Sequence, residues 1–267
     1  MPRFDTSEPI TAHIESAAGS VHLIATDRSD TVVDVRPHNE SRSADIRAAE
    51  RTRVDFAHGT LKVSACKWGL FGARFGSVDI AVELPSRSRL DVSVVSAQVQ
   101  ADGEYTDCRF AAASGNLAIA NVTGNIKADT ASGDVTVDSV TGGSVSTASG
   151  DAKIGECDGD LKFQAASGDL AVDHLRGNLN ARTASGSITV AAAVRGEISA
   201  HTSSGDVEVG VPTGTAARLD IMTGSGVVTN SLESSDGPAD GDDTLVVHAR
   251  TGSGNVSVRR AVANPAA

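Results

Sequence analysis

The sequence predicts an all-β protein: a right-handed parallel β-solenoid of about 18 residues per coil, preceded by an N-terminal β cap. Two observations predict the solenoid. The motif Thr-Ala-Ser-Gly-Asp, or a close variant, returns along the chain, and its Ser-Gly pairs at first recur every 17 to 19 residues. Between the pairs, apolar and polar residues alternate as they do in half-buried strands. The serines of the pairs are Ser114, Ser132, Ser149, Ser167, Ser185, Ser204, Ser225 and Ser253.

Each repeat contains two short strands, whose apolar side chains we expect to point into a narrow aliphatic core. A single coil cannot cover its own apolar face, so burial depends on stacking. Glycines between the strands and at the Ser-Gly corner predict turns that tolerate a positive φ. The first strand supplies the inward residues Leu117, Val135, Ala152, Leu170, Ile188 and Val207, and the second supplies Ile126, Val145, Leu161, Leu179, Ile198 and Leu219. The intervening glycines are Gly124, Gly143, Gly159, Gly177, Gly196 and Gly214.

Residues 1–95 alternate less regularly, and we expect them to form a β cap or sandwich-like region. A charged, alanine-rich segment at 43–51 predicts one short helix within it. The repeats then occupy 96–267 and include an acidic loop at 231–243, which we interpret as a disordered insertion. The strand-like runs of the cap are 10–14, 20–26, 31–36, 52–57, 60–65, 77–83 and 90–100.

Net charge and composition limit the kinds of binding partner and the cellular compartment that we expect. The net charge is −11, and residues 96–267 carry 11 Lys/Arg against 21 Asp/Glu, so the repeats disfavour nucleic acid and anionic membranes as partners. No apolar run is long enough to span a bilayer and no leader pattern opens the chain, so we expect a cytoplasmic protein. The three cysteines share no Cys-x-x-Cys spacing, which suits a reducing compartment, and we expect Cys157 to be a buried hydrophobe.

Four corner aspartates, Asp134, Asp151, Asp169 and Asp206, fall in one column of the predicted coil. In one interpretation, each carboxylate accepts hydrogen bonds from backbone amides of the turn. In a second, the carboxylates form a calcium ladder, and in a third, pairs of them serve a carbohydrate-active β-helix enzyme. The glycine spacing of calcium-binding solenoids is absent, and few aromatic residues in the repeats could stack on sugars. We therefore favour the first and predict a non-enzyme with no cofactor and no small-molecule substrate.

An aromatic loop at 67–76 interrupts the cap region. Its side chains Trp68, Leu70, Phe71 and Phe75 are candidates for contacting a partner protein, because glycines separate and expose them. The alternative interpretation is a lid that folds over the open end of the coil.

Several segments together resemble a bacterial family of β-strand-repeat proteins that is labelled a domain of unknown function or "putative adhesin". The resemblance covers essentially the whole chain, and it implies a β-solenoid with no catalytic residues to carry over. The segments that carry it are Phe4-Asp-Thr-Ser-Glu-Pro-Ile10, Asp30-Thr-Val-Val-Asp-Val-Arg-Pro37, 44–54, Val82-Glu-Leu-Pro-Ser86 and the Thr-Ala-Ser-Gly-Asp repeats.

These observations predict a non-enzymatic scaffold or protein-interaction module, adhesin-like in architecture, whose partner is an unidentified protein. In a second hypothesis, the coil at 244–260 ends the stack uncapped and pairs end to end with other copies, although Arg259, Arg260 and Pro265 could guard that edge against pairing. The carbohydrate-active enzyme that uses paired aspartates is the third hypothesis.

Overall fold

The computed structural model describes residues 1–65, 76–233, 237–238 and 241–261. Within these ranges the protein is all-β apart from one short helix, and most neighbouring strands pair in parallel, as the repeat pattern predicts. The chain divides into two compact units, residues 1–136 and 137–267. The boundary predicted at residue 95 falls inside a strand of the first unit.

The first unit is built around the long strand β2 (Thr11–Thr26). The first part of β2 pairs in parallel with β5 (Thr60–Ser64), and its second part pairs in parallel with β6 (Val78–Pro85). On the other side of β2, β7 (Ser88–Ala112) runs parallel to both parts and continues into a parallel pairing with β8 (Leu117–Thr130). A long strand such as β2 therefore takes part in two separate sets of parallel pairings, one through its first part and one through its second part.

Antiparallel strands cover the outer sides of β5 and β6. On β5 lies β4 (Arg53–Ala57), and on β6 lies β3 (Asp30–Pro37), which in turn pairs with β1 (Arg3–Asp5). These strands match the predicted runs 52–57 and 31–36 closely. Their antiparallel direction ends the parallel ladder on this side, which is one way to protect a sheet edge from further pairing.

Helix α1 (Ser43–Arg51) coincides with the predicted helical segment and contacts β3 and β6. Asp45 in its first turn is fully buried, and its Oδ1 accepts a hydrogen bond from the backbone N–H of Ser77 at 3.0 Å. Gly76 permits this approach, because a Cβ at that position would lie 2.2 Å from the carbonyl oxygen of Ala44.

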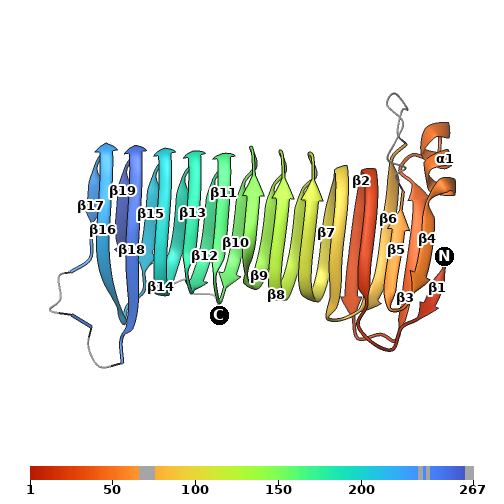
Figure 1. The fold of residues 1–267 in the computed structure, drawn as a ribbon, viewed down its shortest axis with the longest axis horizontal. Helices are drawn as coiled ribbons and strands as arrows, with labels where there is room; N and C mark the ends of the chain where they lie inside the picture. The colour runs from red at the N-terminus through yellow and green to blue at the C-terminus, as the bar shows by residue number, and fades with distance from the viewer. Residues whose placement is uncertain (66–75, 234–236, 239–240, 262–267) are drawn as a thin grey trace. The chain divides into compact units, whose positions relative to one another are not determined.

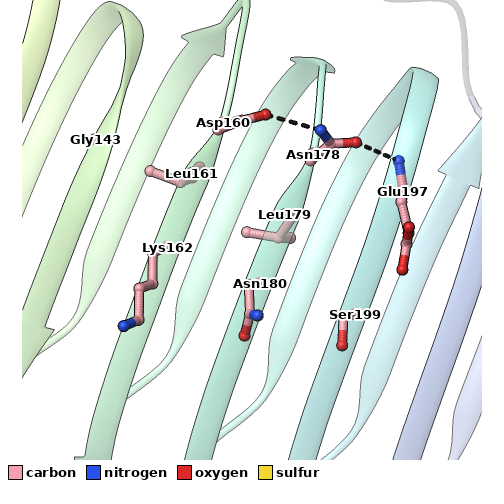
Figure 2. A pocket seen from close by; sticks show the side chains of 9 residues that line it. All are labelled: Gly143, Asp160, Leu161, Lys162, Asn178, Leu179, Asn180, Glu197 and Ser199. Atoms are coloured by element: carbon pink, nitrogen blue, oxygen red, sulfur yellow. Dashed lines mark hydrogen bonds between the residues drawn. The ribbon is translucent and has the colours of Figure 1, made fainter.

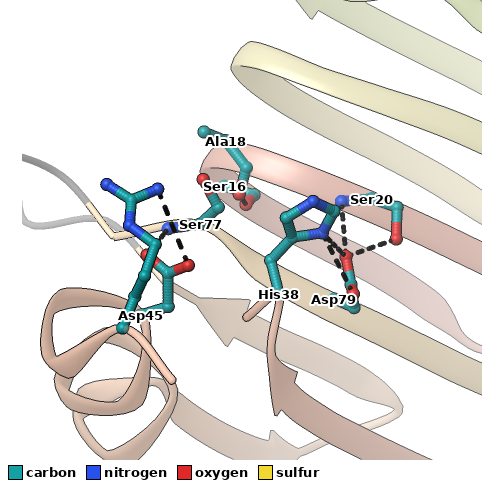
Figure 3. A network of polar contacts seen from close by, with 8 residues as sticks. Ser16, Ala18, Ser20, His38, Asp45, Ser77 and Asp79 are labelled. Atoms are coloured by element: carbon teal, nitrogen blue, oxygen red, sulfur yellow. Dashed lines mark hydrogen bonds and ion pairs between the residues drawn. The ribbon is translucent and has the colours of Figure 1, made fainter. Parts of the chain in front are cut away.

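A polar network ties β2, β3 and β6 together (Figure 3). The carboxylate of Asp79 accepts hydrogen bonds from the Ser20 hydroxyl at 2.7 Å and from the Ser20 amide at 3.2 Å, and it lies 3.0 Å from His38 Nδ1. The hydrogen bond to Asp79 raises the pKa of His38 above its usual 6.5. Burial acts to raise the pKa of Asp79, but the bonds from Ser20 and His38 outweigh it and leave that pKa lowered.

This pair predicts a pH-dependent contribution to stability. Because the folded-state pKa of His38 is raised, its contribution is fully present below about pH 6.5 and is lost as the pH rises through the folded-state value. We expect His38→Ala to lower Tm clearly at about pH 5.5 and much less at about pH 8.5. Thermal unfolding at the two pH values measures this, with the exposed His174→Ala as control. An equal loss of Tm at both values would show that the charge on His38 contributes nothing.

The second unit is itself built of coils, whose strands form two parallel ladders. One ladder contains β9, β11, β13 and the second part of β14, and the other contains β10, β12, the first part of β14 and β15. Residues 18 or 19 positions apart lie side by side, as Leu161 lies beside Leu179 and Leu179 beside Ile198. The strands are β9 (Val135–Thr147), β10 (Ala152–Cys157), β11 (Leu161–Ser167), β12 (Leu170–Arg176), β13 (Leu179–Ser185), β14 (Ile188–Ser204), β15 (Val207–Val211), β16 (Thr215–Ser225), β17 (Val228–Asn230), β18 (Asp243–Ser253) and β19 (Val256–Arg260).

The inward columns predicted from alternation are confirmed. Every predicted inward residue except Leu219 is at most 3% exposed, and these Leu, Ile, Val and Ala side chains form the core. Leu219 is half-buried, and its neighbour in the ladder, Val247, is fully buried. The alternation therefore identifies the correct face of each strand, and the exception marks the coil where the stack ends. The handedness of the coil stays a prediction.

The Ser-Gly corners stack for a different reason from the predicted one. None of their glycines has a positive φ, and among the other turn glycines only Gly143, Gly196 and Gly214 do. What requires glycine at the corner is close approach. A Cβ on Gly186 would lie 2.1 Å from the carbonyl oxygen of Gly168, and one on Gly205 would lie 2.1 Å from that of Gly186. The prediction that positive φ explains these glycines is wrong at the corners.

The last coils do not stack in chain order, which corrects the expectation that 244–260 ends the stack (Figure 1). Strand β18 lies between β14 and β16, in register with both, and β19 lies between β15 and β17. The final coil in sequence, β18 and β19, is therefore intercalated, and the preceding coil, β16 and β17, ends the second unit. The acidic loop predicted at 231–243 makes the connection back from β17 to β18, which explains the longer final repeat.

Disulfide trapping tests this intercalation. Ser199 and His248 are in register on neighbouring strands, so their Cα atoms lie about 5 Å apart, within the range that a disulfide spans. Asp220 is one strand further away, at roughly 10 Å from Ser199. In a Cys66→Ser background, Ser199→Cys with His248→Cys should oxidise readily to an intramolecular disulfide, and Ser199→Cys with Asp220→Cys should not. The opposite result would restore stacking in chain order.

Candidate functional site

The aromatic residues predicted for partner contact, Trp68, Leu70, Phe71 and Phe75, lie outside the residues that the structure describes. Their role as an interaction loop or a lid stays a prediction. Candidate sites are therefore built from the described coils: the aspartate column, the hollows on the coil faces and the end of the stack.

The corner aspartates and asparagines form a hydrogen-bonded ladder along the coils. Asp151 Oδ1 accepts from the backbone N–H of Asp169 at 2.9 Å, and Asp169 Oδ1 accepts from the N–H of Ser187 at 2.7 Å. Asp206 Oδ1 likewise accepts from the N–H of Asn255 at 2.7 Å. In the first unit, Asp134 takes part through its N–H, which donates to Asn116 Oδ1 at 3.0 Å. This is the arrangement that the first interpretation of the column expects.

The ladder gives the aspartates a structural role in joining each coil to the next. Within the ranges that the structure describes, no group of three or more His, Cys, Asp or Glu side chains is placed to hold a metal ion.

A pair of substitutions separates the hydrogen bond from the charge. Asp169→Ala leaves the Ser187 amide without its acceptor, so we expect a loss of about 1–2 kcal/mol in the free energy of unfolding. Asp169→Asn keeps a carbonyl acceptor and should lose much less. Urea unfolding measures both variants. A large calcium-dependent stabilisation of the wild type that disappears in Asp169→Asn would instead favour the calcium ladder.

A second polar ladder borders a shallow hollow on the other side of the coil (Figure 2). Asn178 Nδ2 donates to Asp160 Oδ1 at 2.8 Å, and Asn178 Oδ1 accepts from the backbone N–H of Glu197 at 2.9 Å. The hollow measures about 360 Å³. Side chains from β11, β13 and β14 line it in register, namely Lys162, Asn180 and Ser199. The neighbouring coils thus present an ammonium, an amide and a hydroxyl group, with no repeated chemistry.

The described cysteines are core residues. Cys108 and Cys157 are both buried, at 2% and 1% exposure, and neither forms a disulfide. Burial raises the pKa of Cys108 to about 12 and also raises the pKa of Cys157. A thiol that stays protonated is a poor nucleophile, so Cys157 is a buried hydrophobe as predicted.

The terminal coil of the second unit exposes both backbone and core. Strand β16 pairs with β18 and strand β17 pairs with β19, and no pairing on their other sides occurs within the described part of the chain. Met222, Val227 and Val228 are 59%, 63% and 45% exposed, whereas Val256, the neighbour of Val228 in the next coil, is 1% exposed. Of these three residues, Val228 on β17 is the one in an inward column, so the core opens at this terminal coil, while Met222 lies on the outward face of β16.

The described residues of the acidic loop lie beside the beginning of the β16 edge. A hollow of about 510 Å³ lies between the start of β16 and the described residues of the loop. Its lining includes Ala216 and Leu219 from β16, Asn230 at the end of β17, and Leu232 and Glu233 from the segment that follows.

Sequence reasoning placed the end of the stack one coil too late. One signal was available: Asn230 occupies the inward position that Val209 and Val258 hold in the neighbouring coils. A polar residue in an inward column indicates a coil that water reaches.

Comparison with protein families gives one match along most of the chain. The family model described as Toastrack DUF4097 matches residues 13–261. The match confirms the resemblance predicted from the N-terminal segments and the Thr-Ala-Ser-Gly-Asp repeats. No curated protein matches the sequence.

Several solved structures are similar to the chain along nearly its whole length. A putative adhesin from Bacteroides fragilis is 11% identical, with 96% of this chain and 95% of that chain covered and a TM-score of 0.48. A putative adhesin from Parabacteroides distasonis is 9% identical, with 96% and 95% covered and a TM-score of 0.35. A putative lipid binding protein from the same species is 14% identical, with 97% and 95% covered and a TM-score of 0.33. Identities and scores this low say nothing about a shared function.

Proposed function

The chain belongs to the Toastrack DUF4097 family, and we propose that it is a non-enzymatic protein-interaction module that pairs with a second copy of itself through its terminal coil. The observation that carries this proposal is that the terminal coil has both an unpaired strand edge, among the described residues, and partly exposed core residues. An unpaired strand edge offers a row of N–H and C=O groups to another strand. Beside it, the half-buried Leu219 and Ile221 offer apolar surface that a second coil would cover.

The charges along β16 suit a second copy. In a two-fold antiparallel pairing centred on Leu219, Arg218 of one copy lies opposite Asp220 of the other, and the symmetry makes this pair twice. Both side chains are exposed on the outward face. In the same register, Ala217 faces Ile221 across the pair, so the inward columns of the two copies continue into each other.

The hollow beside the loop fits the same register. Met222 of the second copy would lie opposite Ala216, which lines the 510 Å³ hollow at the start of β16. Met222 is exposed in the single chain, and its long, flexible side chain can fill an irregular space. A two-fold contact uses the same surface on both copies, so the assembly closes at a dimer.

The described polar ladders support a role without catalysis. Asp151, Asp169 and Asp206 each accept a hydrogen bond from a backbone amide of a neighbouring coil, which occupies these carboxylates structurally. The carbohydrate-active alternative needs two carboxylates free to exchange protons with a substrate.

Charge exchange across the two-fold axis tests the pairing. Light scattering over a concentration series should show the mass rising from 27.1 kDa towards twice that value. Arg218→Asp places two like charges opposite each other twice, and we expect it to weaken the dimer by roughly tenfold. Adding Asp220→Arg to that variant reverses both partners and should restore the pairing.

Arg195→Asp serves as the matched control, because it makes the same charge change at an exposed site away from the edge. A mass of 27.1 kDa at every concentration would exclude the dimer. Dimers that form equally well in the wild type and in Arg218→Asp would exclude β16 as the contact.

A further inference from the structure

A row of basic side chains crosses the second unit on the outward face of one ladder. Arg182 on β13 is in register with His201 on β14, and His201 is in register with Arg250 on β18. Neighbouring strands lie about 4.8 Å apart, so the two arginine backbones are roughly 10 Å apart with His201 between them. Both arginines are exposed and His201 is half-buried.

This row is distinguished by its geometry, because two arginines without a described ion pair flank one histidine on adjacent strands. Residues 137–267 carry 9 Lys/Arg against 16 Asp/Glu, and Arg176 and Arg259 form ion pairs with Asp158 and Glu208. Arg182 and Arg250 form no ion pair with any residue that the structure describes. Two unpaired guanidinium groups on either side of one histidine, in an acidic unit, indicate a place for an external anion.

The row lines a hollow of about 460 Å³. The threonines beneath the row turn their hydroxyl groups to the corner glycines, since Thr202 Oγ1 donates to Gly186 O and Thr251 Oγ1 donates to Gly205 O, both at 3.0 Å. The hollow therefore offers guanidinium N–H groups as its principal charged donors. Met222 closes the hollow on the side of the terminal coil.

We propose that Arg182, His201 and Arg250 form a binding site for the phosphate group of a phosphate monoester. Each guanidinium presents parallel N–H donors to two oxygens, and a tetrahedral dianion has enough oxygens for both forks, whereas a carboxylate satisfies one. The arginine side chains are long enough to lean towards each other over His201. This inference goes beyond the proposed pairing and does not depend on it.

The protonation state of His201 should change when an anion binds to the site. Its Nδ1 atom is buried and has no hydrogen-bond partner among the described residues. Burial lowers the pKa of His201, and Arg250, Arg182 and His248 lower it further, so the ring is neutral at pH 7 when the site is empty. These are the cationic and titratable groups that act on it from β13 and β18. A dianion between the arginines offsets their charge, so the ring should take up a proton as the anion binds.

Sulfate is the first probe, because its charge stays constant across the pH range in which histidine titrates. Sulfate at about 20 mM should raise Tm more than sodium chloride of equal ionic strength, because binding to the folded state stabilises it. Arg182→Gln and Arg250→Gln should each weaken sulfate binding at least tenfold. Arg195→Gln, an exposed arginine outside the row, should leave it unchanged. A normal Tm in the absence of sulfate shows that each variant folds.

A second readout follows the His201 ring by NMR. Saturating sulfate should raise the pKa of His201 by about one unit, and sulfate should bind up to tenfold more tightly as the pH falls through that range. His201→Gln should remove this pH dependence, and His248→Gln should keep it. Equal binding by the wild type and both arginine variants, or an unchanged His201 titration, would overturn the site.

Two further probes distinguish a soluble phosphate monoester from a lipid headgroup as the ligand. Glycerol 3-phosphate tests a soluble monoester, and vesicles of phosphatidylcholine with phosphatidic acid test a lipid headgroup. Binding of either probe that depends on Arg182 supports the site and assigns its ligand. Failure of sulfate, glycerol 3-phosphate and the vesicles alike would overturn the proposal, while the dimer measured by light scattering would be unaffected.

Discussion

The coils depend on how closely successive backbones approach each other at the Ser-Gly corner. In the first unit, a Cβ on Gly133 would lie 2.1 Å from the carbonyl oxygen of Gly115, and in the second, one on Gly186 would lie equally close to Gly168. Only glycine allows this spacing at every coil. In the later coils, the residues around the corner then satisfy its polar groups: the hydroxyls of Thr202 and Thr251 donate to glycine carbonyls, and Asp169 accepts from the next backbone amide. With the corners fixed, the apolar columns meet in register.

Local features of this fold could be predicted from the sequence, and its long-range order could not. Helix 43–51 and the inward columns follow from patterns within one element, and the structure confirms them. The order of the last coils could not be predicted because two coils have the same corner motif, one at Ser225 and one at Ser253. Either of them could stack on the coil that contains Ser204. The reason for the corner glycines was also missed, since the repeat spacing identifies the neighbouring coil but not how closely the two backbones approach.

The candidate sites, too, could be predicted only where they depend on local sequence. Net charge correctly describes the unit as acidic, but it averages over the row in which Arg182, His201 and Arg250 meet. These residues are separated by 19 and 49 positions, and stacking in chain order would place Met222 beside His201 instead of Arg250. The open edge of β16 was likewise assigned to the wrong coil until the pairing was known. Both surfaces are products of the intercalated coil.

That intercalation also bears on how the chain is made. Only residues 212–214 separate β15 from β16, yet β16 lies beyond a level that β19 and β18 occupy. During synthesis, the outer coil leaves the ribosome before the coil that it covers. The vacant level must therefore stay open, or be reopened, until residue 260 has emerged. Completion of this unit is a closing insertion between two existing layers, which makes the last step of its folding wait for the synthesis of residues 243–260.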